Sequence, residues 1–193
     1  MRICLYGAAS FSIDNEYIEK VEELGFQMTK RGHSLVFGGG VNGLMGAAAR
    51  GVKKGNGYIL GVIPSFFDEE KIEGVYPDCD ELIETKTMRE RKQIMEDNAD
   101  AFIVTPGGVG TFEEFFEILT SKQLCRHNKP IALYDIRGYY TELNQMMEAA
   151  MEKNFVRENC SELYATIEDP EALLRYIETP VDAIHTVKEL KDG

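Results

Sequence analysis

Several features that would mark particular classes of protein are scarce or absent in this chain of 193 residues. The four cysteines are scattered and form no CxxC pair: Cys4, Cys79, Cys125 and Cys160. This spacing disfavours a structural zinc site and a disulfide framework, so we expect reduced, partly buried thiols and no bound metal. No run approaches the roughly 18 apolar residues that a bilayer-spanning helix needs, and the first residues resemble a strand rather than a signal peptide. We therefore expect a soluble, cytoplasmic protein.

Basic residues are also scarce. The chain has 21 Lys and Arg against 33 Asp and Glu, which gives a net charge of −12. Nucleic-acid polymers and anionic membranes both favour Lys and Arg, so this balance argues against either partner. A small phosphate ligand needs only a local positive site. The length suits one domain, and we expect it to cover residues 1–180, with a charged tail over 181–193.

The stretch that organises the prediction is the glycine-rich turn at residues 105–111. It reads Thr-Pro-Gly-Gly-Val-Gly-Thr and joins a predicted buried strand at 101–104 to a predicted helix at 112–124. Glycines let the backbone approach a ligand closely, and the first turn of a helix offers unpaired N–H groups to a phosphate. Glu113 and Glu114 would lie in that first turn. They either complement the helix dipole, or one of them is a working carboxylate.

Two further turns of small residues follow predicted strands. One is the loop from Gly7 to Ser10, and the other begins at Gly38-Gly39-Gly40 and runs into a helix at 44–53. Neither has the spacing of a dinucleotide fingerprint or the Gly-Lys-Ser/Thr of a Walker A loop. We predict strands at 2–6, 34–37, 58–63, 81–85, 101–104, 129–134 and 163–167, and helices at 14–30, 44–53, 88–98, 112–124, 139–153 and 170–177.

This alternation predicts an α/β fold, a doubly wound parallel sheet with helices on both faces. Such sheets bind ligands at the carboxyl ends of their strands, where all three turns would meet. A nucleotide-sized phosphate ligand is therefore the leading interpretation. Arg89, Arg91 and Lys92 precede the central turn by less than one βα unit. They form either a solvated helix face or a positive group that faces the turn.

The sequence resembles the Lonely Guy (LOG) family, whose members were often labelled "possible lysine decarboxylase". The residues that carry the resemblance are Gly38-Gly39-Gly40 with Gly43-Leu44-Met45-Gly46, Met88 with Glu90-Arg91-Lys92, and Pro106-Gly107-Gly108-Val109-Gly110-Thr111 with Glu114. The resemblance implies a Rossmann-like fold and a homodimer without a cofactor. It also implies hydrolysis of the N-glycosidic bond of AMP or a cytokinin riboside 5′-monophosphate, which yields free base and ribose 5-phosphate. Arg89 stands where the family often has His, and Gly7-Ala8-Ala9-Ser10 replaces its Gly-Ser-Ser; both changes bear on substrate preference.

Site residues follow from the same resemblance. It implies that Arg91 and Glu114 are the catalytic pair. The positions that it implies for substrate binding are Gly39, Gly40, Gly43, Met45, Arg91, Lys92, Gly107, Gly108, Val109, Gly110, Thr111, Glu113, Glu114 and Thr120. A further family glutamate follows the Ile63-Pro64 dipeptide, and the spacing leaves Glu69 and Glu70 as alternatives.

The chemistry of C–N cleavage explains why these residue types matter. Breaking the bond builds positive charge on the ribose, which a carboxylate such as Glu114 stabilises while it orients the attacking water. Arg91 stays protonated and therefore acts as a clamp or donor rather than a general acid. A lysine decarboxylase would need a Schiff-base lysine with pyridoxal phosphate, for which no lysine has a recognisable setting. The alternative is a non-catalytic carrier of a nucleotide or molybdenum cofactor, which would not need the Arg91–Glu114 pair.

Overall fold

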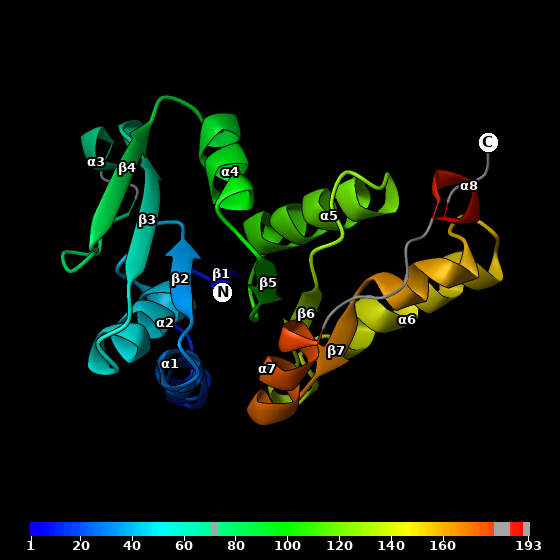
Figure 1. Cartoon of the computed structure of the whole chain (residues 1–193), viewed down its shortest axis with the longest axis horizontal. Helices are drawn as coiled ribbons and strands as arrows, with labels where there is room; N and C mark the ends of the chain where they lie inside the picture. The colour runs from blue at the N-terminus through cyan, green and yellow to red at the C-terminus, as the bar shows by residue number, and fades with distance from the viewer. Residues whose placement is uncertain (71–72, 180–185, 191–193) are drawn as a thin grey trace.

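The computed structural model describes residues 1–70, 73–179 and 186–190, and its centre is a seven-stranded sheet (Figure 1). The strands are β1 Arg2–Tyr6, β2 Ser34–Phe37, β3 Ile59–Pro64, β4 Glu81–Thr85, β5 Ala101–Val104, β6 Ile131–Tyr134 and β7 Ala165–Ile167. Their order is β4-β3-β2-β1-β5-β6-β7, and all neighbours are parallel. The predicted fold class is confirmed. The order changes direction at β1, which places the ligand crevice beyond the carboxyl ends of β1 and its neighbours.

Helices cover both faces of the sheet. One hydrophobic core contains residues of α1 (Asn15–Lys30), α2 (Gly43–Lys54) and α7 (Pro170–Glu178). The other contains residues of α4 (Met88–Asp97), α5 (Val109–Gln123) and α6 (Thr141–Glu152). The short helices are α3 Phe66–Glu69, η1 Ile136–Gly138, η2 Glu158–Leu163 and α8 Val187–Leu190.

The sequence of strand β1 is continuously apolar because both faces of the strand are buried. Ile3 and Leu5 belong to the first core, whereas Cys4 and Tyr6 belong to the second. Successive side chains of a strand point to opposite faces, and here both faces are buried. The two helical layers therefore hold the sheet rigidly, and the loops at its carboxyl edge are left to form a site.

Helix α5 begins earlier than its sequence indicates. Its first residue is Val109 rather than Phe112, because Gly108 adopts an extended conformation as N-cap and Gly110 is accommodated in the first turn. Glu113 and Glu114 therefore lie in the second turn, and the prediction that they lie in the first was wrong. Since the helix dipole acts mainly within the first turn, dipole stabilisation no longer accounts for Glu114.

The segment at 65–80, for which the sequence predicts neither helix nor strand, contains α3 and a short antiparallel pairing with the Gly38–Gly40 turn. Val41 N donates to Gly74 O (2.9 Å), and Tyr76 N donates to Gly39 O (2.8 Å). This pairing brings residues 73–76 back over the carboxyl end of β2. A segment distant in sequence thereby becomes part of the crevice.

Part of the predicted C-terminal tail docks on the chain itself. In the described residues 186–190, Leu190 is buried in the second core, and Gln123 Nε2 on α5 donates to its carbonyl (3.0 Å). The predicted tail residues 181–185 and 191–193 lie outside the described residues.

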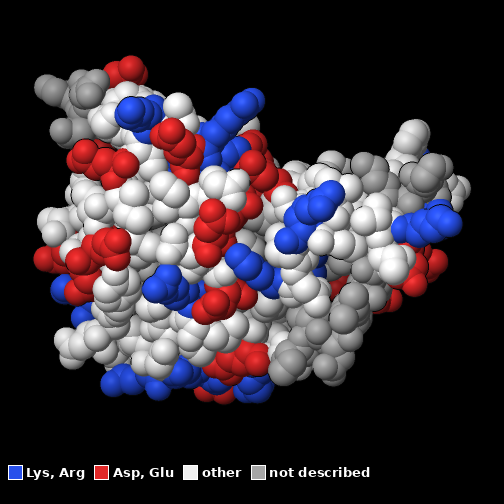
Figure 2. Space-filling model, turned by 45° about the horizontal axis from the view of Figure 1, so that its top comes forward, with Lys and Arg blue, Asp and Glu red and all other residues white. Residues whose placement is uncertain are grey.

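On the face in Figure 2, Lys and Arg are interspersed with Asp and Glu over the described surface. Among the described helices, none has the length and apolar character to cross a bilayer.

Candidate active site

The main-chain carbonyl oxygens of the glycine-rich turn that leads into α5 are fixed by hydrogen bonds. Three donors bind the carbonyl oxygens of three successive residues: Tyr140 Oη to Thr105 O (2.7 Å), Ala8 N to Pro106 O (3.1 Å) and Tyr139 Oη to Gly107 O (2.5 Å). Because these acceptors are occupied, the turn offers a ligand N–H donors rather than carbonyl oxygens. A turn fixed in this way is preorganised for an anion.

The front of the same turn is open. A Cβ placed on Gly108 or Gly110 would meet no other atom within 4 Å. No side chain of the described residues caps the N-terminus of α5, so the N–H groups of Val109, Gly110 and Thr111 have no helical acceptor. The positive end of the dipole adds to their attraction for an anion. The turn has open space and unpaired N–H groups, and phosphate binding there stays a prediction.

The Gly38–Gly40 turn is filled by side chains of the protein itself. A Cβ on Gly38 would lie 1.7 Å from Arg91 Nη2, and one on Gly40 would lie 1.9 Å from Glu73 Oε1. Gly39 takes a positive φ of 75°, which a residue with a side chain rarely adopts. The three glycines thus let the backbone turn and let two charged side chains lie against it.

Arg91 is the cation of the site and is 5% exposed. Its Nη2 donates to Gly38 O (3.0 Å) and its Nε to Val62 O (3.2 Å), so it spans the ends of β2 and β3. The guanidinium also lies over the ring of Phe67, 5.5 Å from the centroid. Arg91 is therefore fixed in place rather than solvated, and its hydrogen bonds go to the Gly38–Gly40 turn and β3. That it faces the central turn stays a prediction.

Glu114 is 9% exposed, and its side chain makes no hydrogen bond or ion pair with any described residue. Burial raises the pKa of its carboxyl to about 7, with Glu113 contributing in the same direction and the charges of Arg91 and Lys92 opposing them. A buried carboxylate normally has a partner, because desolvating it alone is costly. Here the fold keeps a costly group that has electrostatic contact with Arg91 but no structural bond, as functional groups often do.

Glu73 is a second carboxylate beside Arg91, and the sequence reasoning missed it. Its Oε1 is buried without a hydrogen-bond partner among the described residues. Burial raises the pKa of Glu73, and the charge of Arg91 opposes the rise. Of the two predicted glutamates, Glu70 is exposed, and the side chain of Glu69 lies outside the described residues. Only the pairing of 73–76 with the Gly38–Gly40 turn reveals Glu73, and that pairing has no local sequence signal.

The remaining predicted site residues have varied surroundings. Met45 is buried in the first core, and the backbone of Ala8 lies against Gly43, whose φ is 57°. Thr120 is exposed on α5, six residues beyond Glu114. Lys92 Nζ forms ion pairs with Glu113 Oε1 and Glu117 Oε2, each at 2.5 Å. Nothing in this geometry tests substrate contact at these positions, so those contacts stay predictions.

Comparison with known proteins gives a consistent relationship. Residues 45–177 match the family model described as "Possible lysine decarboxylase". The chain is 35% identical over 177 residues to a cytokinin riboside 5′-monophosphate phosphoribohydrolase of Arabidopsis thaliana, covering 92% of this chain and 82% of that protein. It is 38% identical over 173 residues to a protein of the same name from Mycobacterium tuberculosis, with coverages of 90% and 91%.

Solved structures agree on the fold. A molybdenum cofactor binding protein of Rippkaea orientalis has a TM-score of 0.68 at 22% identity, covering 92% of this chain and 94% of that one. The molybdenum cofactor carrier protein of Chlamydomonas reinhardtii has a TM-score of 0.69 at 20% identity, with coverages of 92% and 95%. At such identities the likeness shows the fold alone. The family match and the curated relatives show more: this chain belongs to the Lonely Guy (LOG) family, whose family model is described as "Possible lysine decarboxylase".

Proposed function

We propose that this protein hydrolyses the N-glycosidic bond of a nucleoside 5′-monophosphate, AMP or a cytokinin riboside 5′-monophosphate. The products are the free base and ribose 5-phosphate. The observation that carries the proposal is Glu114, a buried carboxylate without a structural partner, on the same helix as an open anion-binding turn. The names of the relatives in Arabidopsis thaliana and Mycobacterium tuberculosis support this reaction.

In the proposed mechanism, the 5′-phosphate binds the N–H groups at the start of α5. Glu114 lies about one and a half turns further along the helix, roughly 8 Å at 1.5 Å per residue, which is suited to the ribose of the same nucleotide. As the bond between C1′ and the base nitrogen breaks, the Glu114 carboxylate stabilises the positive charge on the ribose. It then accepts a proton from the water whose oxygen bonds to C1′. The departing base takes a proton from solvent, and Glu114 afterwards returns its own proton to solvent.

Arg91 and Glu73 complete the proposed site. Arg91 stays charged and already binds two main-chain carbonyls, so it serves as a fixed donor to the sugar or the departing base. The unpartnered Oε1 of Glu73 would accept a hydrogen bond from a ribose hydroxyl. The contacts implied at Gly39, Gly40 and Thr120, and at the other positions given by the resemblance, belong to the same proposal.

We also propose that the protein is a cytoplasmic homodimer. Helix α6 supports the assembly, because Met147 is its only buried residue while Met146 is 52% exposed. Exposed apolar side chains such as Met146 on a helix that is so little covered are typical of a surface that pairs with another chain. Light scattering coupled to gel filtration should give a mass of about twice 21.8 kDa, and a monomer would refute the dimer without affecting the reaction.

A product assay tests the reaction. Incubation with AMP should release adenine and ribose 5-phosphate in equal amounts, whereas adenosine should react at least about tenfold more slowly because it lacks the phosphate that the turn binds. Binding of AMP without release of adenine would instead support a carrier. Equal turnover of AMP and adenosine would mean that the turn does not recognise phosphate.

A further inference from the structure

The loop after β6 bends sharply beside the glycine-rich turn that follows β5. The two strands are parallel neighbours, so the loops that leave their carboxyl ends lie next to each other (Figure 1). Arg137 and Gly138 take left-handed conformations in succession, with φ of 59° and 69°. A residue with a side chain adopts this conformation at a cost in energy, and such strain is concentrated at functional sites. The bend therefore suggests that this loop serves the neighbouring turn.

Tyr139 follows the bend and binds that turn. Its hydroxyl donates to Gly107 O (2.5 Å), and its ring meets the ring of Tyr17 on α1 edge to face, with 6.5 Å between the centroids. The guanidinium of Arg137 lies 5.6 Å from the Tyr17 centroid and forms an ion pair with Asp14 (3.2 Å). These contacts with the start of α1 hold the Tyr139 side chain in place although Tyr139 is 36% exposed.

The hydrogen bond to Gly107 O sets the direction of the next N–H group. In a trans peptide the carbonyl oxygen and the N–H of the following residue point in opposite directions, and none of the described peptide bonds is cis. Because Gly107 O points at Tyr139, the N–H of Gly108 points away from it. Gly108 is exposed, and its N–H has no acceptor among the described residues. This donor precedes the unpaired N–H groups at the start of α5.

The peptide between Gly107 and Gly108 would turn over easily without this restraint. Both of its residues are glycines, whose backbone dihedral angles are permissive. A rotation of the peptide plane would place the Gly107 carbonyl oxygen where the Gly108 N–H had been. An anion is attracted by an N–H group and repelled by a carbonyl oxygen, so the rotation would weaken phosphate binding.

We propose that Tyr139 is a positioning residue, which keeps the peptide between Gly107 and Gly108 in the orientation that presents the Gly108 N–H to the substrate phosphate. The inference deepens the proposed function, because it rests on phosphate binding at this turn, although it does not rest on cleavage of the nucleotide. Tyr139 itself does not touch the phosphate and acts only through the main chain of the turn.

Tyr140 offers a comparison within the same turn. Its hydroxyl donates to Thr105 O (2.7 Å), and Tyr140 is fully buried. The residue after Thr105 is Pro106, which has no N–H that this hydrogen bond could orient. Loss of the Tyr140 hydroxyl should therefore affect stability, whereas loss of the Tyr139 hydroxyl should affect phosphate binding.

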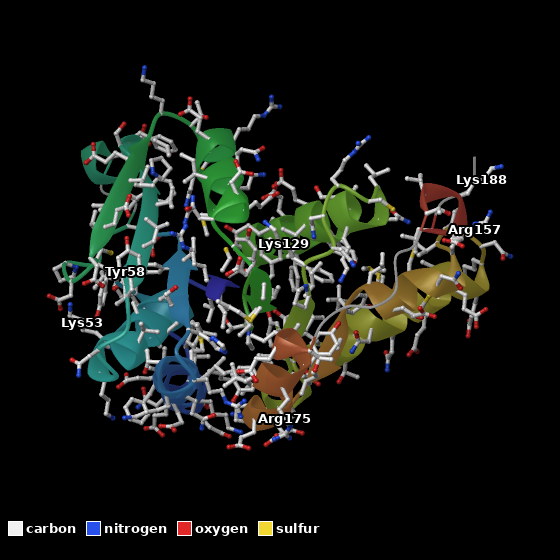
Figure 3. All side chains as sticks on the ribbon, viewed as in Figure 1. Lys53, Tyr58, Lys129, Arg157, Arg175 and Lys188 are labelled. Carbon is white, nitrogen blue, oxygen red and sulfur yellow. The ribbon has the colours of Figure 1, made fainter. Side chains whose placement is uncertain are left out.

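The experiment compares Tyr139→Phe with Tyr140→Phe and with the control Tyr58→Phe. Tyr58, labelled in Figure 3, immediately precedes β3 and so lies at the opposite edge of the sheet from the turn. It is 44% exposed, and its hydroxyl donates to Glu81 Oε2 (2.6 Å). Tyr58→Phe therefore removes a hydroxyl of similar exposure that also makes a hydrogen bond, but far from the proposed phosphate site.

Calorimetry with ribose 5-phosphate and thermal unfolding should give opposite patterns for the two variants of the loop. In Tyr139→Phe the dissociation constant should rise about tenfold, the effect of losing one hydrogen bond to a charged group, while the melting temperature stays within about 3 °C of wild type. In Tyr140→Phe the melting temperature should fall by about 5 °C, because Thr105 O loses its buried partner, and the dissociation constant should rise less than about threefold. Tyr58→Phe should change neither quantity.

NMR and kinetics provide measurements that a purely structural role would not change. Ribose 5-phosphate should shift the amide resonance of Gly108 in wild type, and this shift should be lost in Tyr139→Phe. For AMP, kcat/KM should fall about tenfold in Tyr139→Phe through a higher KM, while the slow turnover of adenosine, which has no phosphate, stays unchanged.

The outcomes separate this proposal from the proposed function. Wild-type affinity for ribose 5-phosphate in Tyr139→Phe, or a Gly108 amide that ribose 5-phosphate does not shift in wild type, would overturn the role of Tyr139 even if AMP is cleaved. Binding of ribose 5-phosphate that depends on Tyr139, in a wild-type protein that does not cleave AMP, would refute the proposed reaction and leave the role of Tyr139 supported.

Discussion

The two glycine-rich turns at the carboxyl edge of the sheet look alike in sequence but differ in what fills them. At Gly38–Gly40 the space that side chains would occupy holds Arg91 and Glu73. At Gly108 and Gly110 that space is open. A run of glycines can therefore admit the protein's own charged side chains or admit a ligand. In this chain one turn builds the charged half of the site, and the other leaves room for the substrate.

The substitution expected to have the largest effect on the difference between the two turns is Gly38→Ala. The new Cβ would displace the Arg91 guanidinium, and the backbone itself should tolerate alanine because the φ of Gly38 is not positive. We expect kcat/KM for AMP to fall about 100-fold, the size of losing one fixed donor to the transition state. Steady-state kinetics measures the loss, and circular dichroism checks that the fold persists. Unchanged kinetics in a folded variant would remove Arg91 from the site.

Gly108→Ala probes the open turn and should have a smaller effect of a different kind. Alanine meets no atom within 4 Å there and has an allowed φ of −96°, so the melting temperature should stay within about 2 °C of wild type. The added methyl group would obstruct the phosphate, and we expect KM for AMP to rise about tenfold with little change in kcat. A fall in stability without a change in KM would show that this turn is structural, like the other.

The free energy of unfolding should depend on pH because Glu114 is buried without a partner. Its folded pKa, about 7, lies above the ordinary value of 4.5 for a glutamate, so its contribution to stability is present below pH 4.5 and is lost as pH rises through 7. Glu114→Gln should therefore unfold less readily than wild type at pH 8, by about 1–3 kcal/mol, and the difference should vanish near pH 4. Urea denaturation at the two pH values measures it. A variant less stable than wild type at pH 8 would mean that Glu114 serves the fold.

The fold could be predicted from the sequence because strands buried on both faces are continuously apolar and alternate with helical patterns, as β1 shows. The start of α5 could not be predicted, because glycines such as Gly108 and Gly110 are typical of loops and here flank the first residue of the helix. Glu73 could not be found either, since its approach to Arg91 depends on the antiparallel pairing of residues 73–76 with Gly39–Val41. The opposite contents of the two glycine turns likewise depend on side chains that arrive from other parts of the chain.

The most direct test of the central claim is the single-turnover rate of AMP cleavage by Glu114→Gln, measured beside its affinity for ribose 5-phosphate. If Glu114 is the carboxylate that stabilises the ribosyl cation, the rate falls at least about 100-fold while ribose 5-phosphate binds as tightly as to wild type. Cleavage at the wild-type rate would contradict the account and assign the chemistry to another group.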